Sequence, residues 1–219
     1  MPAPPLRIST TALKQWNPCH DTAGTHTERD LPRGSIPVLE TKRLALRAPR
    51  LEDAKTVATL ANDRRIAENT ARIPHPYKMS DAEGFIAGAN KAGGEAVFLI
   101  TLRDGAIVGA CGVVLQQDET PELGYWLGLP YWGQGYATEA LHAVIDYAFT
   151  DLSHEALQAG ARVTNPASRR VLEKCGFQWT GVGLYRISSI KSSAPIDRFR
   201  LERGIWSALK TWGRMKRVS

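Results

Sequence analysis

Cysteine is scarce in this sequence of 219 residues. Its three cysteines, Cys19, Cys111 and Cys175, are odd in number and widely spaced, so they outline neither a disulfide framework nor a zinc site. No apolar run reaches membrane-spanning length, and the N-terminus lacks the apolar segment of a secretory signal. We therefore expect a protein of the reducing cytoplasm, with no membrane partner.

Metal-ligand spacing is also missing. His75 and His142 have no partner at a spacing that a metal site requires, so no metal is expected. The formal net charge is +6, and part of it gathers near the C-terminus. A basic segment can bind a polyanion, but this one contains no RNA- or DNA-binding motif. We interpret it as a solvated helical face or a frayed end and expect no nucleic-acid partner.

The length and the 43% apolar content suit one globular domain with a tail. Residues 1–36 are rich in proline, threonine and polar residues without a period, which predicts an extension that is flexible or packed on the surface. The domain is expected over residues 37–204, and a basic C-terminal helix or tail over 205–219. There is no internal repeat.

Hydrophobic periods along the domain alternate between those of strands and those of helices, which predicts an α/β (α+β) fold. Leu44, Leu46 and Ala48 alternate as in a strand, and residues 51–62 follow a helical period. Ser80 and Glu83 are interpreted as the capping box of a second helix. Asp104 and Gly105 predict a tight turn between two strands, with a third strand after them.

A longer helix is expected from Tyr136, because the apolar residues that follow share one face. These residues are Ala137, Ala140, Leu141, Val144, Ile145, Ala148 and Phe149. After a strand at about 155–163, a further helix has Asn165 as N-cap, Pro166 at its first position and Gly176 beyond its end. Strands at about 177–187 and 196–204 complete the sheet.

The stretch YWGQGYATEA, residues 131–140, places Gly133 and Gly135 between a strand and that longer helix. Unpaired backbone N–H groups and the helix dipole favour an anion at such a helix start. The alternative is that the glycines only make a tight turn. The Gly-Lys-Ser/Thr of a P-loop is absent, and Thr138 stands where a Rossmann loop has its third glycine.

The segment WGQGYA resembles the acetyl-CoA pyrophosphate loop of the GNAT N-acetyltransferases, in which Gln or Arg, two spacers, Gly, one spacer and Gly or Ala follow one another. Gly135 and Ala137 fit this pattern and Trp132 departs from it. Three segments, 39–54, 122–141 and 165–177, are similar in order and spacing to the RimJ/RimL branch of ribosomal-protein N-terminal alanine acetyltransferases, where Trp is common at the first loop position. The resemblance covers roughly residues 38–204.

This resemblance implies one GNAT-like domain, with a mixed, mostly antiparallel sheet of about seven strands, about four flanking helices, and the cofactor between two splayed parallel strands. The cofactor would be acetyl-CoA or CoA, and the acceptor a primary amine of a protein N-terminus or a small molecule. The alternative is a CoA-binding sensor or interaction domain without catalysis. The oligomeric state stays open, with a homodimer as one option. The implied cofactor-binding residues are Trp126, Leu127, Trp132, Gly133, Gln134, Gly135, Tyr136, Ala137, Asn165 and Arg170.

Two side chains are candidates for proton transfer. Glu122, on the strand before the loop, has the position of a general base in similar enzymes; the alternative is a surface carboxylate paired with a cation. Leu172 stands where many GNAT enzymes have tyrosine, and the similar RimL-like branch instead has serine at the position of Ser168, so the resemblance makes Ser168 the candidate acid; the alternative is a serine that caps its helix or bonds back to the helix backbone. A backbone N–H near Trp126 and Leu127 would meet the oxyanion. Arg170 would contact phosphate or remain solvated.

Overall fold

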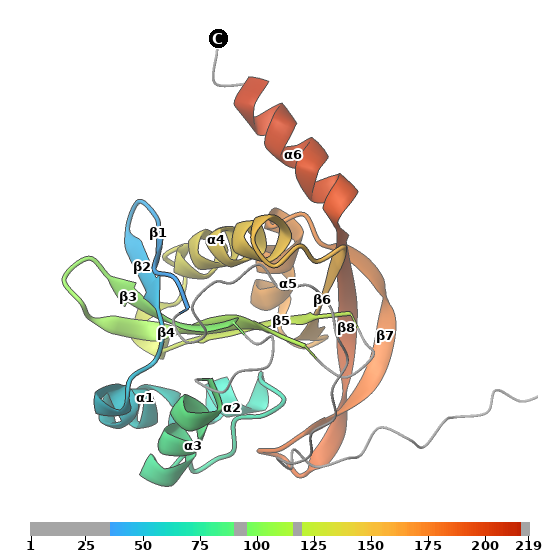
Figure 1. Ribbon diagram of the computed structural model, residues 1–219. Helices are drawn as coiled ribbons and strands as arrows, with labels where there is room; N and C mark the ends of the chain where they lie inside the picture. Colours follow the sequence, from blue (N-terminus) through green and yellow to red (C-terminus); the bar gives the residue numbers. More distant parts are fainter. Residues whose placement is uncertain (1–35, 90–95, 116–119, 216–219) are drawn as a thin grey trace, which may run out of the picture. The chain divides into compact units, whose positions relative to one another are not determined.

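An eight-stranded sheet runs through the fold of this computed structural model, which describes residues 36–89, 96–115 and 120–215 (Figure 1). The strand order is β1-β2-β3-β4-β5-β6-β8-β7, and the pairs are antiparallel except β5 with β6. The strands are β1 (Leu39–Glu40), β2 (Leu44–Arg47), β3 (Ala96–Leu102), β4 (Ile107–Val114), β5 (Glu122–Leu127), β6 (Ala156–Arg162), β7 (Gln178–Ile187) and β8 (Ser192–Glu202). The mixed, mostly antiparallel sheet is thus confirmed.

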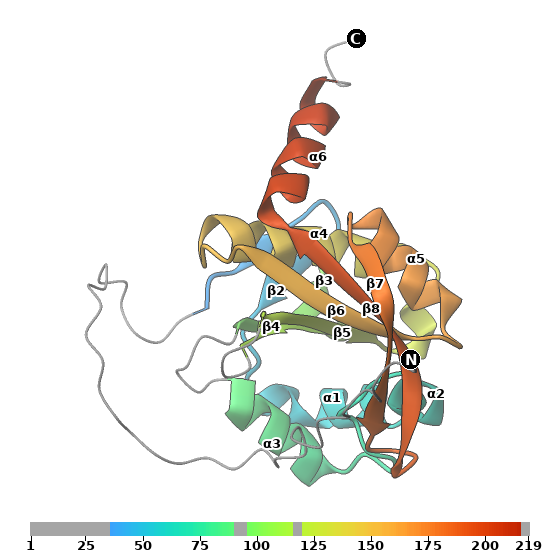
Figure 2. The ribbon, with the colours of Figure 1, turned by 90° about the vertical axis from the view of Figure 1, so that its right-hand side faces the viewer.

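Helices cover both faces of this sheet (Figures 1 and 2). On one face lie α1 (Ala54–Ala61), α2 (Arg64–Glu68) and α3 (Met79–Ala89), and on the other α4 (Tyr136–Thr150) and α5 (Pro166–Lys174). The described residues add α6 (Arg203–Met215) and two 3-10 turns, η1 (Leu51–Asp53) and η2 (Leu129–Tyr131). The additional strand and helices are short or terminal: β1 has two residues and α2 has five, too few to show a period.

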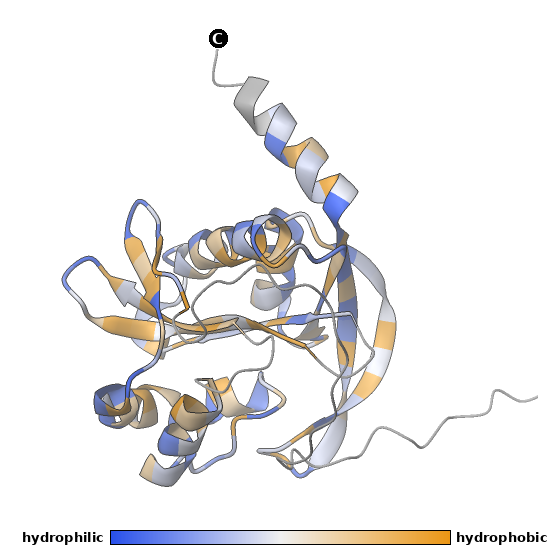
Figure 3. Cartoon of the chain, viewed as in Figure 1, coloured by the Kyte–Doolittle hydropathy of each residue, from blue (hydrophilic) through white to orange (hydrophobic). Residues whose placement is uncertain are grey.

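Two apolar clusters hold the layers together. The larger one joins α4 and α5 to the sheet and includes Phe98, Phe149 and Phe199, while the smaller joins α1 and α3 to the opposite face around Val57 and Leu99. Figure 3 shows this as apolar colour along the central strands. All seven residues expected on the inner face of α4 are buried. Burying a large aliphatic side chain contributes about 1.5–3 kcal/mol, so this face is a main source of stability.

Local signals in the sequence gave mixed results. The Asp104–Gly105 turn is confirmed, with Gly105 at φ +91° and its N–H donating to the Leu102 carbonyl at 3.0 Å. The capping box of Ser80 and Glu83 is wrong, because α3 already begins at Met79. The carboxylate of Asp81 accepts the Lys78 N–H at 2.7 Å, so Asp81 closes this helix start and Ser80 lies inside the first turn.

The last helix is attached to the domain through its first two turns. The Trp206 ring packs against Phe149 at a tilt, with 5.2 Å between ring centroids, and its Nε1 donates to Asp146 at 2.8 Å; Lys210 pairs with the same carboxylate. The expected boundary at 204/205 therefore falls two residues inside α6, which begins at Arg203. The expected extension over residues 1–36 lies outside the described residues except for Ile36. Among the helices described, none is long and apolar enough to cross a membrane.

Candidate active site

The glycine loop connects the end of β5 to the start of α4. Gly133 and Gly135 have φ values of +74° and +79°, in the left-handed region that L side chains rarely adopt. Gly135 is the N-cap of α4, and it has no side chain that could accept the first-turn N–H groups. The first turn of α4 therefore presents donors and the positive end of the helix dipole to an outside acceptor.

The space above this loop fits an anion. A Cβ built on Gly133 meets nothing within 4 Å, and one built on Gly135 lies 3.4 Å from Nη2 of Arg43. Both glycines are exposed. A phosphate could thus reach the backbone N–H groups without meeting a side chain, and a guanidinium already stands beside it. The positive φ values make the requirement for glycine conformational, and a bound phosphate would add a steric one.

The parallel strands β5 and β6 separate just before the loop. They pair at one register position, Glu122 opposite Gln158, where the Gln158 N–H donates to the Pro121 carbonyl at 2.9 Å. Beyond that point β5 continues to pair with β4 along its other edge. The expected splay is confirmed, and it opens the β6-facing edge of Gly124–Leu127.

Strand alternation decides which backbone groups face this opening. The Gly128 N–H donates to the Val108 carbonyl at 2.9 Å, so the N–H groups of Gly128 and Trp126 point toward β4. The N–H of Leu127 consequently points into the gap between β5 and β6. The Leu127 carbonyl, on the same edge, accepts from Nε1 of Trp132 at 2.8 Å. Of the two residues expected to supply the oxyanion donor, Leu127 has the suitable orientation.

A cleft of about 160 Å³ occupies this opening. It brings together residues from α2 and the loop after it, from β5, from the glycine loop, and from α5 and its N-cap. Its lining is Ile66, Asn69, Thr70, Tyr125, Trp126, Leu127, Trp132, Gly133, Asn165, Ala167, Ser168 and Val171. Six of the twelve expected site residues are in this lining. Four more follow it along the chain into α4: Gln134, Gly135, Tyr136 and Ala137. The remaining two, Glu122 and Arg170, lie outside the lining.

Ser168 lies in the cleft and is hydrogen-bonded to a tyrosine. Its Oγ is 2.9 Å from the hydroxyl of Tyr125, and its N–H donates to Oδ1 of Asn165 at 3.1 Å, which is the expected N-cap. Burial raises the pKa of Tyr125 to about 12, and the hydrogen bond with Ser168 offsets only part of this effect. Tyr125 therefore keeps its proton at neutral pH.

Glu122 lies on the opposite face of β5 from Tyr125. Trp126 packs into the α1–α3 cluster, and Glu122 shares that side by alternation. The side chain is about one-third exposed, and Oε2 accepts from Nη2 of Arg72 at 3.3 Å. Its place at the point of separation suits a base, and its ion pair suits a surface carboxylate, so its role remains a prediction.

Comparison with known proteins gives the family. Residues 43–178 match the family described as acetyltransferase (GNAT) domain. The chain belongs to this GNAT family. It is 31% identical to the uncharacterized N-acetyltransferase p20 of Bacillus licheniformis over 149 residues, 66% of this chain and 84% of that protein.

Solved structures show the same fold as this GNAT domain. RimJ of Mycobacterium smegmatis, in complex with CoA-disulfide, has a TM-score of 0.64 and 22% identity over 78% of this chain and 88% of its own. Spermidine N-acetyltransferase of Vibrio cholerae, in complex with CoA and spermine, has a TM-score of 0.65 and 20% identity over 76% and 99%. At these identities the likeness concerns the fold.

Sequence reasoning missed two features of this GNAT site. One is Tyr125, whose only sequence signal is its alternation with Leu123 and Leu127 on the α5 side of β5. The other is the contact of Arg43 with the glycine loop, which joins residues 91 positions apart. Arg170 is exposed on α5, whereas its neighbour Arg169 pairs with Glu173 at 2.9 Å. The described residues contain no cluster of side chains that could hold a metal ion.

Proposed function

We propose that this GNAT protein is an acetyl-CoA-dependent N-acetyltransferase of the RimJ/RimL type, which acetylates a primary amine by direct attack. The observation that carries the proposal is the opening between β5 and β6 immediately before a glycine loop at the start of α4. The names of RimJ and spermidine N-acetyltransferase, both solved with CoA or a CoA derivative, support it.

The loop and the cleft would hold different parts of the cofactor. The backbone N–H groups of residues 133–137 would bind the pyrophosphate, since they carry the positive end of the α4 dipole. Asn165 and the open edge of β5 would line the pantetheine arm, with Trp132 at the mouth of the cleft. When bound, acetyl-CoA supplies an acetyl thioester that is reactive toward amines.

Four groups of the chain would then serve the transfer. Glu122 accepts a proton from the incoming ammonium, directly or through one water, so that the amine can form the new N–C bond. The Leu127 N–H stabilises the negative charge on the carbonyl oxygen, an interaction worth roughly a hundredfold in rate. Ser168 would supply a proton to the departing thiolate and regain one from Tyr125, while the second proton that the nitrogen loses on becoming an amide would pass to solvent. Tyr125 recovers its proton from solvent.

The acid–base demand of the reaction favours some acceptors. Freeing a protein α-amine of pKa near 8 at pH 7 costs about 1.4 kcal/mol, whereas a lysine side chain near 10.4 costs about 4.6 kcal/mol. A single carboxylate can therefore deprotonate an α-amine more easily than a lysine side chain. We therefore propose a protein N-terminal α-amine or a small-molecule amine as the acceptor, in agreement with the RimJ/RimL resemblance.

The test is incubation of the protein with acetyl-CoA and a panel of N-terminal peptides, spermidine and other small amines, read by mass spectrometry. We expect a mass gain of one acetyl group on an α-amine or small amine, dependent on the enzyme. Binding of CoA without acetylation of any amine in the panel would favour the sensor or interaction domain instead. Absence of both binding and transfer would contradict the proposal.

A further inference from the structure

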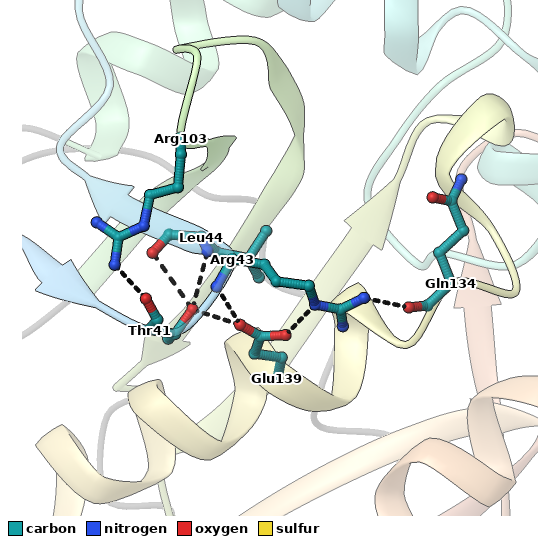
Figure 4. A network of polar contacts seen from close by, with 6 residues as sticks. All are labelled: Thr41, Arg43, Leu44, Arg103, Gln134 and Glu139. Carbon is teal, nitrogen blue, oxygen red and sulfur yellow. Dashed lines mark hydrogen bonds and ion pairs between the residues drawn. The ribbon is translucent and has the colours of Figure 1, made fainter.

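Arg43 connects the sheet to the glycine loop (Figure 4). It stands just before β2, and its guanidinium donates from Nε to Glu139 at 2.7 Å and from Nη1 to the Gln134 carbonyl at 2.9 Å. The same guanidinium lies 4.6 Å from the centre of the Tyr136 ring. Arg43 thus contacts the loop and the first turn of α4 at three points.

Glu139 creates an electrostatic problem at this helix start. A carboxylate in the first turn of α4 is favourable for the empty helix but would repel a phosphate bound at the same end. Burial alone raises the pKa of Glu139, but bonds from Thr41 and Arg43 outweigh it and lower the pKa, so the group is charged at neutral pH. The Glu139 carboxylate accepts hydrogen bonds from Thr41 Oγ1 at 2.7 Å, from the Arg43 backbone N–H at 2.8 Å and from Nε of Arg43.

One end of the guanidinium remains for a ligand. Among the described residues, Nη2 of Arg43 has no hydrogen-bond partner, and it lies 3.4 Å from the position that a Cβ of Gly135 would take. The side chain is 43% exposed. Nη2 therefore stands over the bare backbone of the loop, where an oxygen of a bound phosphate would meet it.

We propose that Arg43 is a phosphate-binding residue of the cofactor site: Nε neutralises Glu139, Nη1 fixes the loop through the Gln134 carbonyl, and Nη2 contacts the CoA pyrophosphate. This inference rests on the proposed function and adds a cation to a site otherwise made of backbone N–H groups. Lysine could not replace it fully, because an ammonium group cannot span three acceptors in a fixed fork.

Calorimetric titration with CoA separates this role from simple support of the loop. Arg43→Ala should weaken CoA binding about 10- to 100-fold, the range for charged hydrogen bonds, and Arg43→Lys should lie between it and the wild type. Glu139→Gln removes the anion and leaves the Arg43 cation in place, so CoA should bind as tightly as in the wild type or a few-fold more tightly. If Arg43 only supported the loop through Glu139, then Glu139→Gln would weaken binding as much as Arg43→Ala, which would overturn the proposal.

Two further measurements complete the design. Arg50→Ala removes the same charge from an exposed side chain 66% accessible to solvent, and it should leave CoA affinity unchanged. The salt dependence of CoA affinity should be shallower in Arg43→Ala than in the wild type, since one ion contact is lost. Thermal melting of each variant checks the fold. If Arg43→Ala does not fold, Arg43→Lys and Glu139→Gln still test the role of Arg43.

The outcomes separate the two proposals. A wild type that binds no CoA would contradict the proposed function. If the wild type binds CoA and Arg43→Ala binds it with equal affinity, only this inference is contradicted.

Discussion

The two faces of β5 differ in how they are built. On the α4–α5 face, the cap of α5 and the positive-φ glycines are fixed by local backbone geometry, and the Tyr125–Ser168 pair joins β5 to α5. On the α1–α3 face, Glu122 has a side-chain ion pair with Arg72, which reaches over from the loop after α2. If the proposed assignment holds, cofactor binding relies mainly on local backbone conformation together with Arg43, whereas acceptor binding depends on contacts between loops that are distant in sequence.

Loops that are distant in sequence meet on the second face. In the β7–β8 turn, the Ser188 and Ser189 hydroxyls each donate at 2.9 Å to the carbonyls of Ala71 and Ala67. This turn therefore holds the segment that carries Arg72 beside Glu122. Differences in such loops would change the acceptor while leaving the cofactor site intact.

The largest effect is expected from Gly135→Asp, which breaks the cofactor face alone. A carboxylate at the pyrophosphate position opposes like charges, which costs several kcal/mol, so CoA affinity should fall by about 1,000-fold or more. Isothermal calorimetry measures this loss. Gly105→Asp is the matched control, because Gly105 also has a positive φ and open space, yet lies in the β3–β4 turn. Equal CoA affinity in a folded Gly135→Asp variant would contradict the assignment of the loop.

Glu122→Gln tests the acceptor face. The substitution keeps the side-chain size and removes its basicity, so turnover should fall by about 100-fold while CoA affinity persists. Raising the pH should recover part of the rate, since more of the amine then arrives deprotonated. Steady-state rates across pH provide the measurement, and Glu155→Gln, at an exposed glutamate paired with Arg203, is the control. A variant with full turnover and an unchanged pH profile would show that Glu122 is only a surface carboxylate and not the base.

Ser168→Ala should have a smaller effect, because a departing thiolate with a pKa near 8.5 needs little help from an acid. We expect a loss of roughly 10-fold in turnover, below the usual range for acid–base groups. Tyr125→Phe removes the other hydroxyl of the pair, and the double variant should be no slower than the slower single one if both act as a unit. Additive losses would show that the two hydroxyls act separately.

Arg72→Ala should have the smallest effect. An exposed ion pair contributes about 0–1 kcal/mol, so kcat/KM should change by less than about 5-fold, with CoA affinity unaltered. Kinetics with the amine identified by mass spectrometry would measure it. A much larger rise in KM for the amine would show that Arg72 binds the acceptor itself.

Local features of the sequence were sufficient for much of the cofactor face. The inner face of α4, the cap at Asn165 and the loop glycines follow from periods and residue types within a few positions. The Tyr125–Ser168 and Arg43–Glu139 contacts join residues 43 and 96 positions apart, so only the folded sheet reveals them. The predicted Ser80–Glu83 capping box was wrong for a local reason: the helix begins one residue before Ser80, and the Asp81 carboxylate accepts the Lys78 N–H at its start.

We propose above all that the opening between β5 and β6, together with the glycine loop, binds the cofactor. Calorimetric titration of the whole chain with CoA tests it most directly. We predict one site per chain with a dissociation constant between about 1 μM and 1 mM, the usual range of KM values for enzymes, and loss of that site in Gly135→Asp but not in Gly105→Asp. Absence of binding at millimolar CoA, or equal binding by both variants, would contradict the account.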